Sequence, residues 1–194
     1  VQRFRAVGII FAGTVRGQIE GVTATTNCLS GILVNATSSH ISVDANVSVR
    51  NGAVAVTAAA VTGEAGRGGI TIFGSDNRIR WNETGGNGYA DPADDHGIGI
   101  RSGNNNVIEA NTAIGNTNGI ILFPASTNTV VRGNVVVGNP PIQVSVSLPA
   151  STGFDILNLS APGTSTFDRN LCITAVNAPC PDLSTSPVPR KPQN

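Results

Sequence analysis

The sequence has little charge and few aromatic side chains. Of its 194 residues, 12% are charged and 4% are aromatic, the formal net charge is zero, and Lys191 is the only lysine. An average domain carries about 25% charged residues, and a nucleic-acid-binding surface needs clustered basic side chains. The composition therefore argues against a nucleic-acid partner. The sequence also lacks an apolar run of the ~20 residues that a transmembrane helix needs, so no membrane span is expected.

Methionine is absent and cysteine is rare. Because the sequence begins at Val1 without methionine, and without a basic segment followed by an apolar one, we expect a processed protein or part of a longer protein truncated at its N-terminus. Cys172 and Cys180 are eight residues apart, a spacing that permits a local disulfide. Such a bridge would indicate an oxidising compartment, and hence an extracellular, periplasmic or cell-surface protein. Cys28 is left over, and we expect a small buried apolar residue rather than a reactive thiol.

Asparagine recurs at a fixed spacing. Four anchor asparagines are each followed five residues later by another asparagine, and an apolar residue stands three positions before each anchor. The anchors are Asn46, Asn82, Asn111 and Asn134, their partners are Asn51, Asn87, Asn116 and Asn139, and the apolar residues are Val43, Ile79, Ile108 and Val131. Because asparagine tolerates the left-handed conformation of tight corners, we expect these residues at turns, in ladders through stacked coils.

A glycine-isoleucine pair recurs upstream of the anchors. The glycines are Gly8, Gly31, Gly69, Gly97 and Gly119, and the residue two positions after each isoleucine is also apolar. The steps between these glycines are 23, 38, 28 and 22 residues, which indicates a base period of 22 to 24 residues with two insertions. Each period holds three short stretches of alternating apolar residues, which predicts three strands per coil. The sequence lacks the 3.6-residue periodicity of a helical bundle and the crossover helices of a Rossmann-type sheet.

Two segments resemble known repeats. Asn-Asn-Val-Ile-Glu-Ala-Asn at 105–111 and Asn-Thr-Val-Val-Arg-Gly-Asn at 128–134 are similar to the parallel β-helix repeats of pectate-lyase-like proteins, and the resemblance covers roughly residues 6–180. It implies an all-β fold, a right-handed parallel β-helix with three short strands per coil and five to seven coils. The superfamily includes lyases, hydrolases, epimerases, phage tailspikes and adhesins, so the fold does not imply one function.

The C-terminal part departs from the regular pattern. Residues 154–170 resemble a degenerate last coil, and a disulfide between Cys172 and Cys180 would pin that coil as a cap on the solenoid. We therefore expect a β-helix domain over residues 1–183 and a Pro/Ser-rich flexible tail over residues 184–194.

Two further segments resemble enzyme motifs incompletely. Asp-Asp-His-Gly at 94–97 resembles the double-aspartate segment of polygalacturonases, in which paired carboxylates serve as the acid and as the base that activates water. The partner motifs of that family, Asn-Thr-Asp, Gly-His-Gly and Arg-Ile-Lys, are missing. Tyr-Ala-Asp-Pro at 89–92 more loosely resembles a segment of mannuronan epimerases. There Ala93 stands where a histidine is expected, and His96 would have to compensate.

Both insertions, at 52–68 and 88–96, directly precede a glycine-isoleucine strand and are expected to wall a groove above it. Side chains of a strand alternate between its two faces, so the first and third residues after each glycine point inward and the second and fourth point outward. The second positions are Ile10, Leu33, Thr71, Gly99 and Ile121, and the fourth positions are Ala12, Asn35, Phe73, Arg101 and Phe123.

This outward row predicts a ligand. Phe73 and Phe123 flank Arg101, one coil to either side. Aromatic rings stack on pyranose rings and arginine pairs with carboxylates, so an acidic polysaccharide is the predicted ligand. The predicted binding residues are Asn35, Thr71, Phe73, Tyr89, Asp91, Arg101 and Phe123, and the catalytic candidates, if the protein is an enzyme, are Asp94, Asp95, His96 and Arg101. No cofactor is expected, and the alternative is a Ca²⁺ ion at Asp91, Asp94 and Asp95.

Three functions remain open at this point. The preferred one is an extracellular β-solenoid module that binds polysaccharide or a cell-surface partner on the outward row. The second is a polysaccharide-active lyase, hydrolase or epimerase, and the third is a structural or adhesive fragment that forms homo-oligomers through an exposed apolar strip. The outward row can equally consist of ordinary residues covered by the insertions. We expect His40 in a solvated turn, and Trp81, beside Arg80, to serve in packing.

Overall fold

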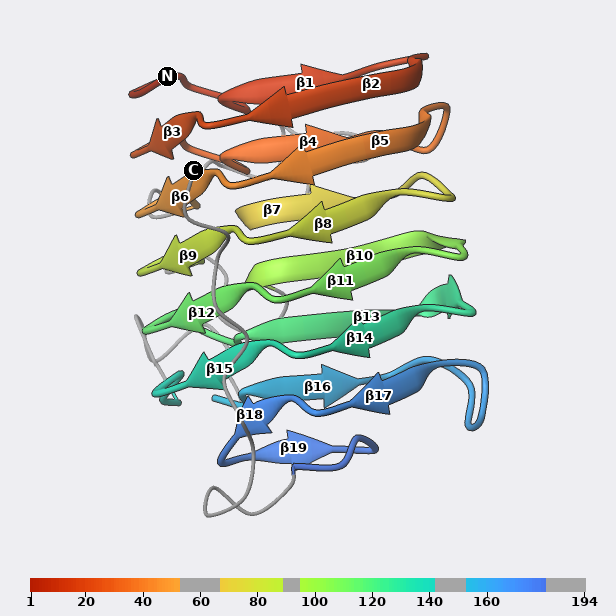
Figure 1. Cartoon of the computed structure of the whole chain (residues 1–194). Helices are drawn as coiled ribbons and strands as arrows, with labels where there is room; N and C mark the ends of the chain where they lie inside the picture. The colour runs from red at the N-terminus through yellow and green to blue at the C-terminus, as the bar shows by residue number, and fades with distance from the viewer. Residues whose placement is uncertain (53–66, 89–94, 142–152, 181–194) are drawn as a thin grey trace.

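Every described secondary-structure element is a β-strand. The computed structural model describes residues 1–52, 67–88, 95–141 and 153–180, and the chain winds through them as a stack of coils (Figure 1). The strands form three sheets, in which hydrogen-bonded neighbours lie three strands apart in the sequence and pair in parallel. The fold is therefore a parallel β-helix with three strands per coil, as predicted.

Each coil contributes one strand to each sheet. Sheet one contains β1 (Ile9–Phe11), β4 (Ile32–Val34), β7 (Gly68–Ile72), β10 (His96–Asn104), β13 (Ile120–Thr127), β16 (Ile156–Asn158) and β19 (Ala175–Val176). Sheet two contains β2 (Val15–Glu20), β5 (Ser39–Asp44), β8 (Arg78–Arg80), β11 (Val107–Glu109), β14 (Val130–Arg132) and β17 (Thr166–Asp168). Sheet three contains β3 (Thr23–Thr25), β6 (Val47–Val49), β9 (Glu83–Gly85), β12 (Thr112–Ile114), β15 (Val135–Val137) and β18 (Leu171–Cys172). The described strands make six coils and the start of another.

Isoleucine ladders fill the interior of the coils. On sheet one, Ile32, Ile70, Ile98, Ile120 and Ile156 follow one another in register, and each is fully buried. Burying one such side chain stabilises the fold by roughly 1.5–3 kcal/mol. The prediction that the first and third residues after each glycine point inward is confirmed, because these isoleucines and Val34, Ile72, Ile100 and Leu122 belong to the core.

The glycine before each isoleucine is required by close packing at the corner between sheets three and one. A Cβ atom at Gly97 would lie 2.6 Å from Oγ1 of Thr84 and 2.7 Å from Nδ2 of Asn116. A Cβ atom at Gly69 would likewise lie 2.9 Å from Nδ2 of Asn87. The recurring glycine therefore marks the point where the chain passes directly over the second asparagine of each pair.

Two ladders of buried asparagines hold the corners in register. Along the anchor ladder, from Asn82 onward, the side-chain oxygen of each asparagine accepts hydrogen bonds of 2.8–3.1 Å from the backbone N–H and from Nδ2 of the anchor one coil earlier. The same Nδ2 group also donates to a backbone carbonyl, as from Asn82 to Val43 at 2.8 Å. The anchor ladder runs through Asn46, Asn82, Asn111, Asn134 and Asn170, and the second through Asn27, Asn51, Asn87, Asn116 and Asn139. Because every polar atom has a partner, burial of these amides carries little penalty.

The C-terminal coil is closed by a carboxylate and a disulfide. Asp155 ends the second ladder, where its Oδ1 accepts from Nδ2 of Asn139 at 2.9 Å and its Oδ2 accepts from the backbone of Ile173 and Thr174. The predicted bridge between Cys172 and Cys180 is present, with the two Cα atoms 5.3 Å apart. The last coil is therefore pinned as expected, whereas the predicted tail lies outside the described residues.

The structure also tests the predictions for Cys28 and His40. Cys28 is a free thiol, as expected, but it is only half-buried rather than enclosed in the core. His40 is exposed, as expected, but it is the second residue of β5 and does not lie in a turn as predicted. In the parts of the chain that the structure describes, no helix is long and apolar enough to cross a membrane.

Candidate functional site

The outer face of sheet one is largely covered, not open. The residues two positions after the recurring glycines do point away from the core, yet the exposed fractions of Leu33, Thr71 and Ile121 are only 1%, 0% and 0%. In this row Ile10 is exposed, at 56%. The expected apolar strip for oligomerisation is therefore not continuous, and the alternative that these residues are covered holds for Leu33 and Ile121.

A buried chain of polar side chains crosses this face. Oγ of Ser30 lies 2.7 Å from Oγ1 of Thr71, which in turn lies 3.0 Å from Nε2 of His96. These three residues come from successive coils, and each has an exposed fraction of 0%. The chain thus ties β7 and β10 to the segment before β4 through side chains that belong to none of the repeating ladders.

His96 fits because its neighbours are glycines. A Cβ atom at Gly99 would lie 2.6 Å from Cδ2 of His96, and a Cβ atom at Gly68 would lie 2.8 Å from the same atom. The imidazole therefore occupies the volume that two side chains would otherwise take. It also meets Phe123 edge to face, with ring centroids 5.9 Å apart. His96 thus lies inside the covered layer of sheet one.

Arg101 lies next to this layer, where the repeat is interrupted. Ile100 is opposite Leu122 and Ser102 is opposite Ala125, so β13 holds one residue more than β10 at this point. Such a bulge bends a strand and redirects its side chains. The guanidinium carbon of Arg101 lies 4.3 Å from the ring centroid of Phe123, within the range of a cation–π contact. The predicted juxtaposition of Arg101 with Phe123 is confirmed.

Phe73 and Asn35 complete the described part of the row. Phe73 directly follows β7 and is partly exposed, and its carbonyl accepts a 2.8 Å hydrogen bond from the hydroxyl of Ser102 on the neighbouring coil. Because Ile72 pairs with Ile100, the backbone of Phe73 lies alongside that of Arg101 on the neighbouring coil, as predicted. Asn35 instead closes its own turn, since its side-chain oxygen accepts from the hydroxyls of Thr37 and Ser38 at 2.9 and 3.0 Å.

The acidic candidates are only partly described. Tyr89, Asp91 and Asp94 lie outside the described residues, as do most of both insertions. Asp95 is buried, with an exposed fraction of 1%, and its backbone carbonyl accepts a 3.1 Å bond from Nδ2 of Asn118. Within the described ranges, no group of three or more His, Cys, Asp or Glu side chains is placed to hold a metal ion. The Ca²⁺ alternative therefore stays a prediction.

The outer face of sheet two behaves differently, since its charges pair with one another. Arg80 donates to both carboxylate oxygens of Asp44, at 2.8 and 3.1 Å, and these hydrogen bonds raise the pKa of Arg80. Glu109 accepts from Arg78 at 2.8 Å and lies 3.2 Å from Arg132. Partial burial on its own raises the pKa of Glu109, but the two arginines hold it below its ordinary value. This face thus offers little uncompensated charge to a ligand.

A comparison with known families agrees with the geometry. A family model described as "Right handed beta helix region" matches residues 1–171. This match supplies the handedness of the coils that the sequence led us to expect. No curated protein and no solved structure matches the chain significantly.

Proposed function

The chain belongs to the right-handed β-helix family, and from this premise we propose that it is an extracellular module that binds an acidic polysaccharide on the outer face of sheet one. The observation that carries the proposal is the position of Arg101, half-buried over the ring of Phe123 and beside the partly exposed Phe73. The guanidinium group of Arg101 suits the carboxylate of an acidic sugar, and the partly exposed ring of Phe73 suits the apolar face of a pyranose. The disulfide between Cys172 and Cys180 supports export.

The buried chain of Ser30, Thr71 and His96 supports the proposal because it orders the residues beneath the binding groups. These side chains hold the layer on which Arg101 and Phe123 rest, so the binding groups need little rearrangement when a ligand arrives. Affinity is greater when the binding groups are already ordered in the free protein, because less conformational entropy is lost on binding. Thr71, one of the predicted binding residues, would then contribute by holding His96 in place and would not contact the ligand itself.

Binding is favoured over catalysis for a geometric reason. A general acid or base must come within hydrogen-bond reach of the substrate proton. Nε2 of His96 instead faces Thr71 at 3.0 Å, and both His96 and Asp95 are enclosed. Of the catalytic candidates, Arg101 is the one described residue with partial exposure. A lyase, hydrolase or epimerase therefore remains the second hypothesis, dependent on Asp94.

The test is a binding measurement with a charge-matched control. Calorimetric titration with polygalacturonate and with alginate should give saturable binding of at least one of them. The Arg101→Ala variant should weaken that binding about 10- to 100-fold, the range expected for losing a charged hydrogen-bonded pair. Arg5→Ala is the control, because Arg5 is exposed and its loss changes net charge equally.

Two outcomes would overturn this proposal. Equal affinity of the wild type and the Arg101→Ala variant, with both folded, would remove Arg101 from the site. Release of reducing ends or of unsaturated sugar by the wild type, abolished in the Arg101→Ala variant, would replace the binding module by the enzyme hypothesis.

A further inference from the structure

The corner between sheets two and three requires a left-handed backbone in each coil. Ala45, Trp81 and Ala110 stand at equivalent positions of consecutive coils, with φ angles of +51°, +55° and +53°. Gly21 and Gly133 occupy the same corner one coil further out on each side. Glycine adopts this conformation freely, whereas it is unfavourable for a bulky residue. A tryptophan here is therefore not explained by the needs of the turn.

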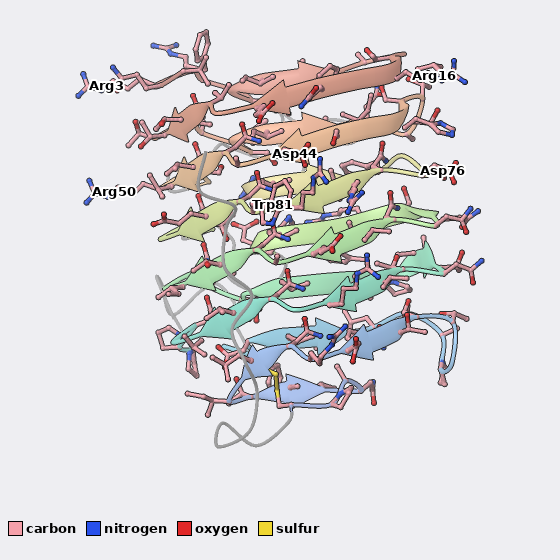
Figure 2. The ribbon with its side chains drawn as sticks, viewed as in Figure 1. Arg3, Arg16, Asp44, Arg50, Asp76 and Trp81 are labelled. Carbon is pink, nitrogen blue, oxygen red and sulfur yellow. A yellow bond between two sulfur atoms is a disulfide. The ribbon has the colours of Figure 1, made fainter. Side chains whose placement is uncertain are left out.

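Packing in the core does not explain Trp81 either. The ring is only partly buried, and it lies on the outer surface of the solenoid, on the same side as Asp44 (Figure 2). The guanidinium carbon of Arg80 lies 4.3 Å from the ring centroid. Arg80 is itself held by both oxygens of Asp44, and Asp44 accepts a further 2.6 Å bond from the hydroxyl of Ser42. The indole is thus fixed in place on the surface by a contact whose charge is already compensated.

A hollow of about 250 Å³ lies beside the ring, and we name it the Trp81 pocket. The pocket is formed by residues at or just after the corner in three consecutive coils. Arg80 lies before this corner, so the pocket is on the other side of Trp81 along the chain. The small side chains of Ala45 and Ala110, above and below, leave this space open. Clefts that enclose drug-sized ligands measure roughly 300–1,000 Å³. The Trp81 pocket therefore suits a single ring rather than a long ligand.

The rim of the pocket carries hydrogen-bonding groups. Glu83 and Thr112 face each other across adjacent coils, since they pair in register between β9 and β12. Glu83 is exposed, and its backbone N–H donates to the carbonyl of Asn46 at 2.8 Å, whereas its carboxylate makes no hydrogen bond or ion pair with any residue in the described ranges. Its carboxylate can accept from two vicinal hydroxyl groups, and the hydroxyl of Thr112 can donate or accept.

We propose that the Trp81 pocket binds one uncharged pyranose unit of a glycan. The apolar face of the sugar stacks on the indole, and its hydroxyls bond to Glu83 and Thr112. Among the described residues that line the pocket, Glu83 is the only one that ionises, and Arg80 is neutralised by Asp44. The pocket therefore repels a uronate. This chemistry separates it from the proposed Arg101 site on sheet one, and the two sites do not depend on each other.

The experiment uses the fact that Trp81 is the only tryptophan. Its fluorescence reports on this pocket alone. We would titrate the protein with cello-, manno-, galacto- and xylo-tetraose, with tri-galacturonate and with choline, and follow the emission maximum and quenching by acrylamide. A saturable shift and protection from quenching are expected with at least one neutral tetraose and not with tri-galacturonate or choline.

Matched variants separate the pocket from general effects. Glu83→Gln and Thr112→Val should each weaken the response at least fivefold while leaving the unfolding midpoint unchanged. Thr23→Val is the control, because Thr23 occupies the same register column two coils from Glu83, with no tryptophan beside it. Arg101→Ala should also leave the response unchanged, which keeps the outcome independent of the proposed site on sheet one.

Several results would overturn the proposal. One is the absence of any spectral response to all four neutral tetraoses. Another is a response that Glu83→Gln and Thr112→Val leave unaltered. A response to choline instead of the sugars would assign the pocket to a cationic ligand, and a response to tri-galacturonate would contradict the charge argument.

Discussion

The outer faces of sheets one and two differ although the same coils build both. On sheet two, Asp44, Arg80, Glu109 and Arg132 follow one another in register and alternate in sign, so each charge finds its partner in an adjacent coil. On sheet one, where insertions precede two strands, the outer residues His96, Arg101 and Phe123 do not repeat. Charges that recur at equivalent positions of successive coils thus neutralise one another on sheet two, whereas residues that break the repeat form the candidate site on sheet one.

The largest expected effect is a loss of stability, and it tests whether the inner isoleucine ladders of sheets one and two contribute equally to folding. Ile98 on sheet one and Ile108 on sheet two are both fully buried. Ile98→Ala and Ile108→Ala should each lower the free energy of unfolding by about 2–5 kcal/mol, because a cavity replaces a core side chain. Urea unfolding followed by circular dichroism would measure this. A loss confined to one variant would contradict the equivalence of the inner ladders.

A smaller effect should appear where the outer face of sheet one departs from the repeat. Gly99→Ala places a Cβ atom against the ring of His96 and should destabilise the protein by about 1–3 kcal/mol through overpacking. Gly85→Ala on sheet three is the control, because its nearest neighbour would be 3.2 Å away at the carbonyl of Ile114. Thermal unfolding of both variants gives the comparison. Equal stability of the two would place His96 elsewhere.

The polar chain on sheet one can be tested on its own. Thr71→Val removes the hydroxyl between Ser30 and His96 and should cost about 1–2 kcal/mol, because two buried hydrogen bonds are lost. Adding Ser30→Ala to Thr71→Val should cost less than the sum of the single changes, since both act on one network. Full additivity in denaturant unfolding would argue against the chain.

The smallest effect concerns the ion pairs of sheet two. Because the folded-state pKa of Glu109 is lowered, its pairs stabilise the protein above the ordinary pKa of glutamate, and this contribution is lost as the pH falls through the lower folded value. Glu109→Gln should cost less than ~1 kcal/mol near neutral pH and nothing in acid. Unfolding midpoints at low and high salt would check this, since salt should reduce the difference. A salt-independent difference would point to packing instead.

Much of the scaffold was predictable from particular residues. The asparagine pairs fixed the corners because a buried amide in a stacked coil must bond to its copy in the next coil, as Asn82 does with Asn111. The glycine before each isoleucine predicted which residues point inward. The spacing of Cys172 and Cys180 was sufficient for the bridge, because a local pairing needs little knowledge of the rest of the fold.

The candidate sites were harder to predict. The sequence placed Arg101 beside Phe123, since both follow from counting along the coils. It did not predict that Thr71 and His96 are enclosed, because burial of an outward residue depends on segments distant in the sequence. Trp81 was expected to pack. The signal that would have identified it is a bulky residue at a corner position that Ala45 and Ala110 hold in the neighbouring coils.

The sequence by itself determined the solenoid, its three-strand coils, its ladders and its C-terminal bridge, because each of these follows from contacts between equivalent residues one period apart. The tertiary structure alone decided which outward residues meet solvent, how His96 joins Thr71 and Ser30, and where a hollow remains beside Trp81. These features arise from residues that do not repeat, and their contacts depend on the three-dimensional packing of side chains from several coils.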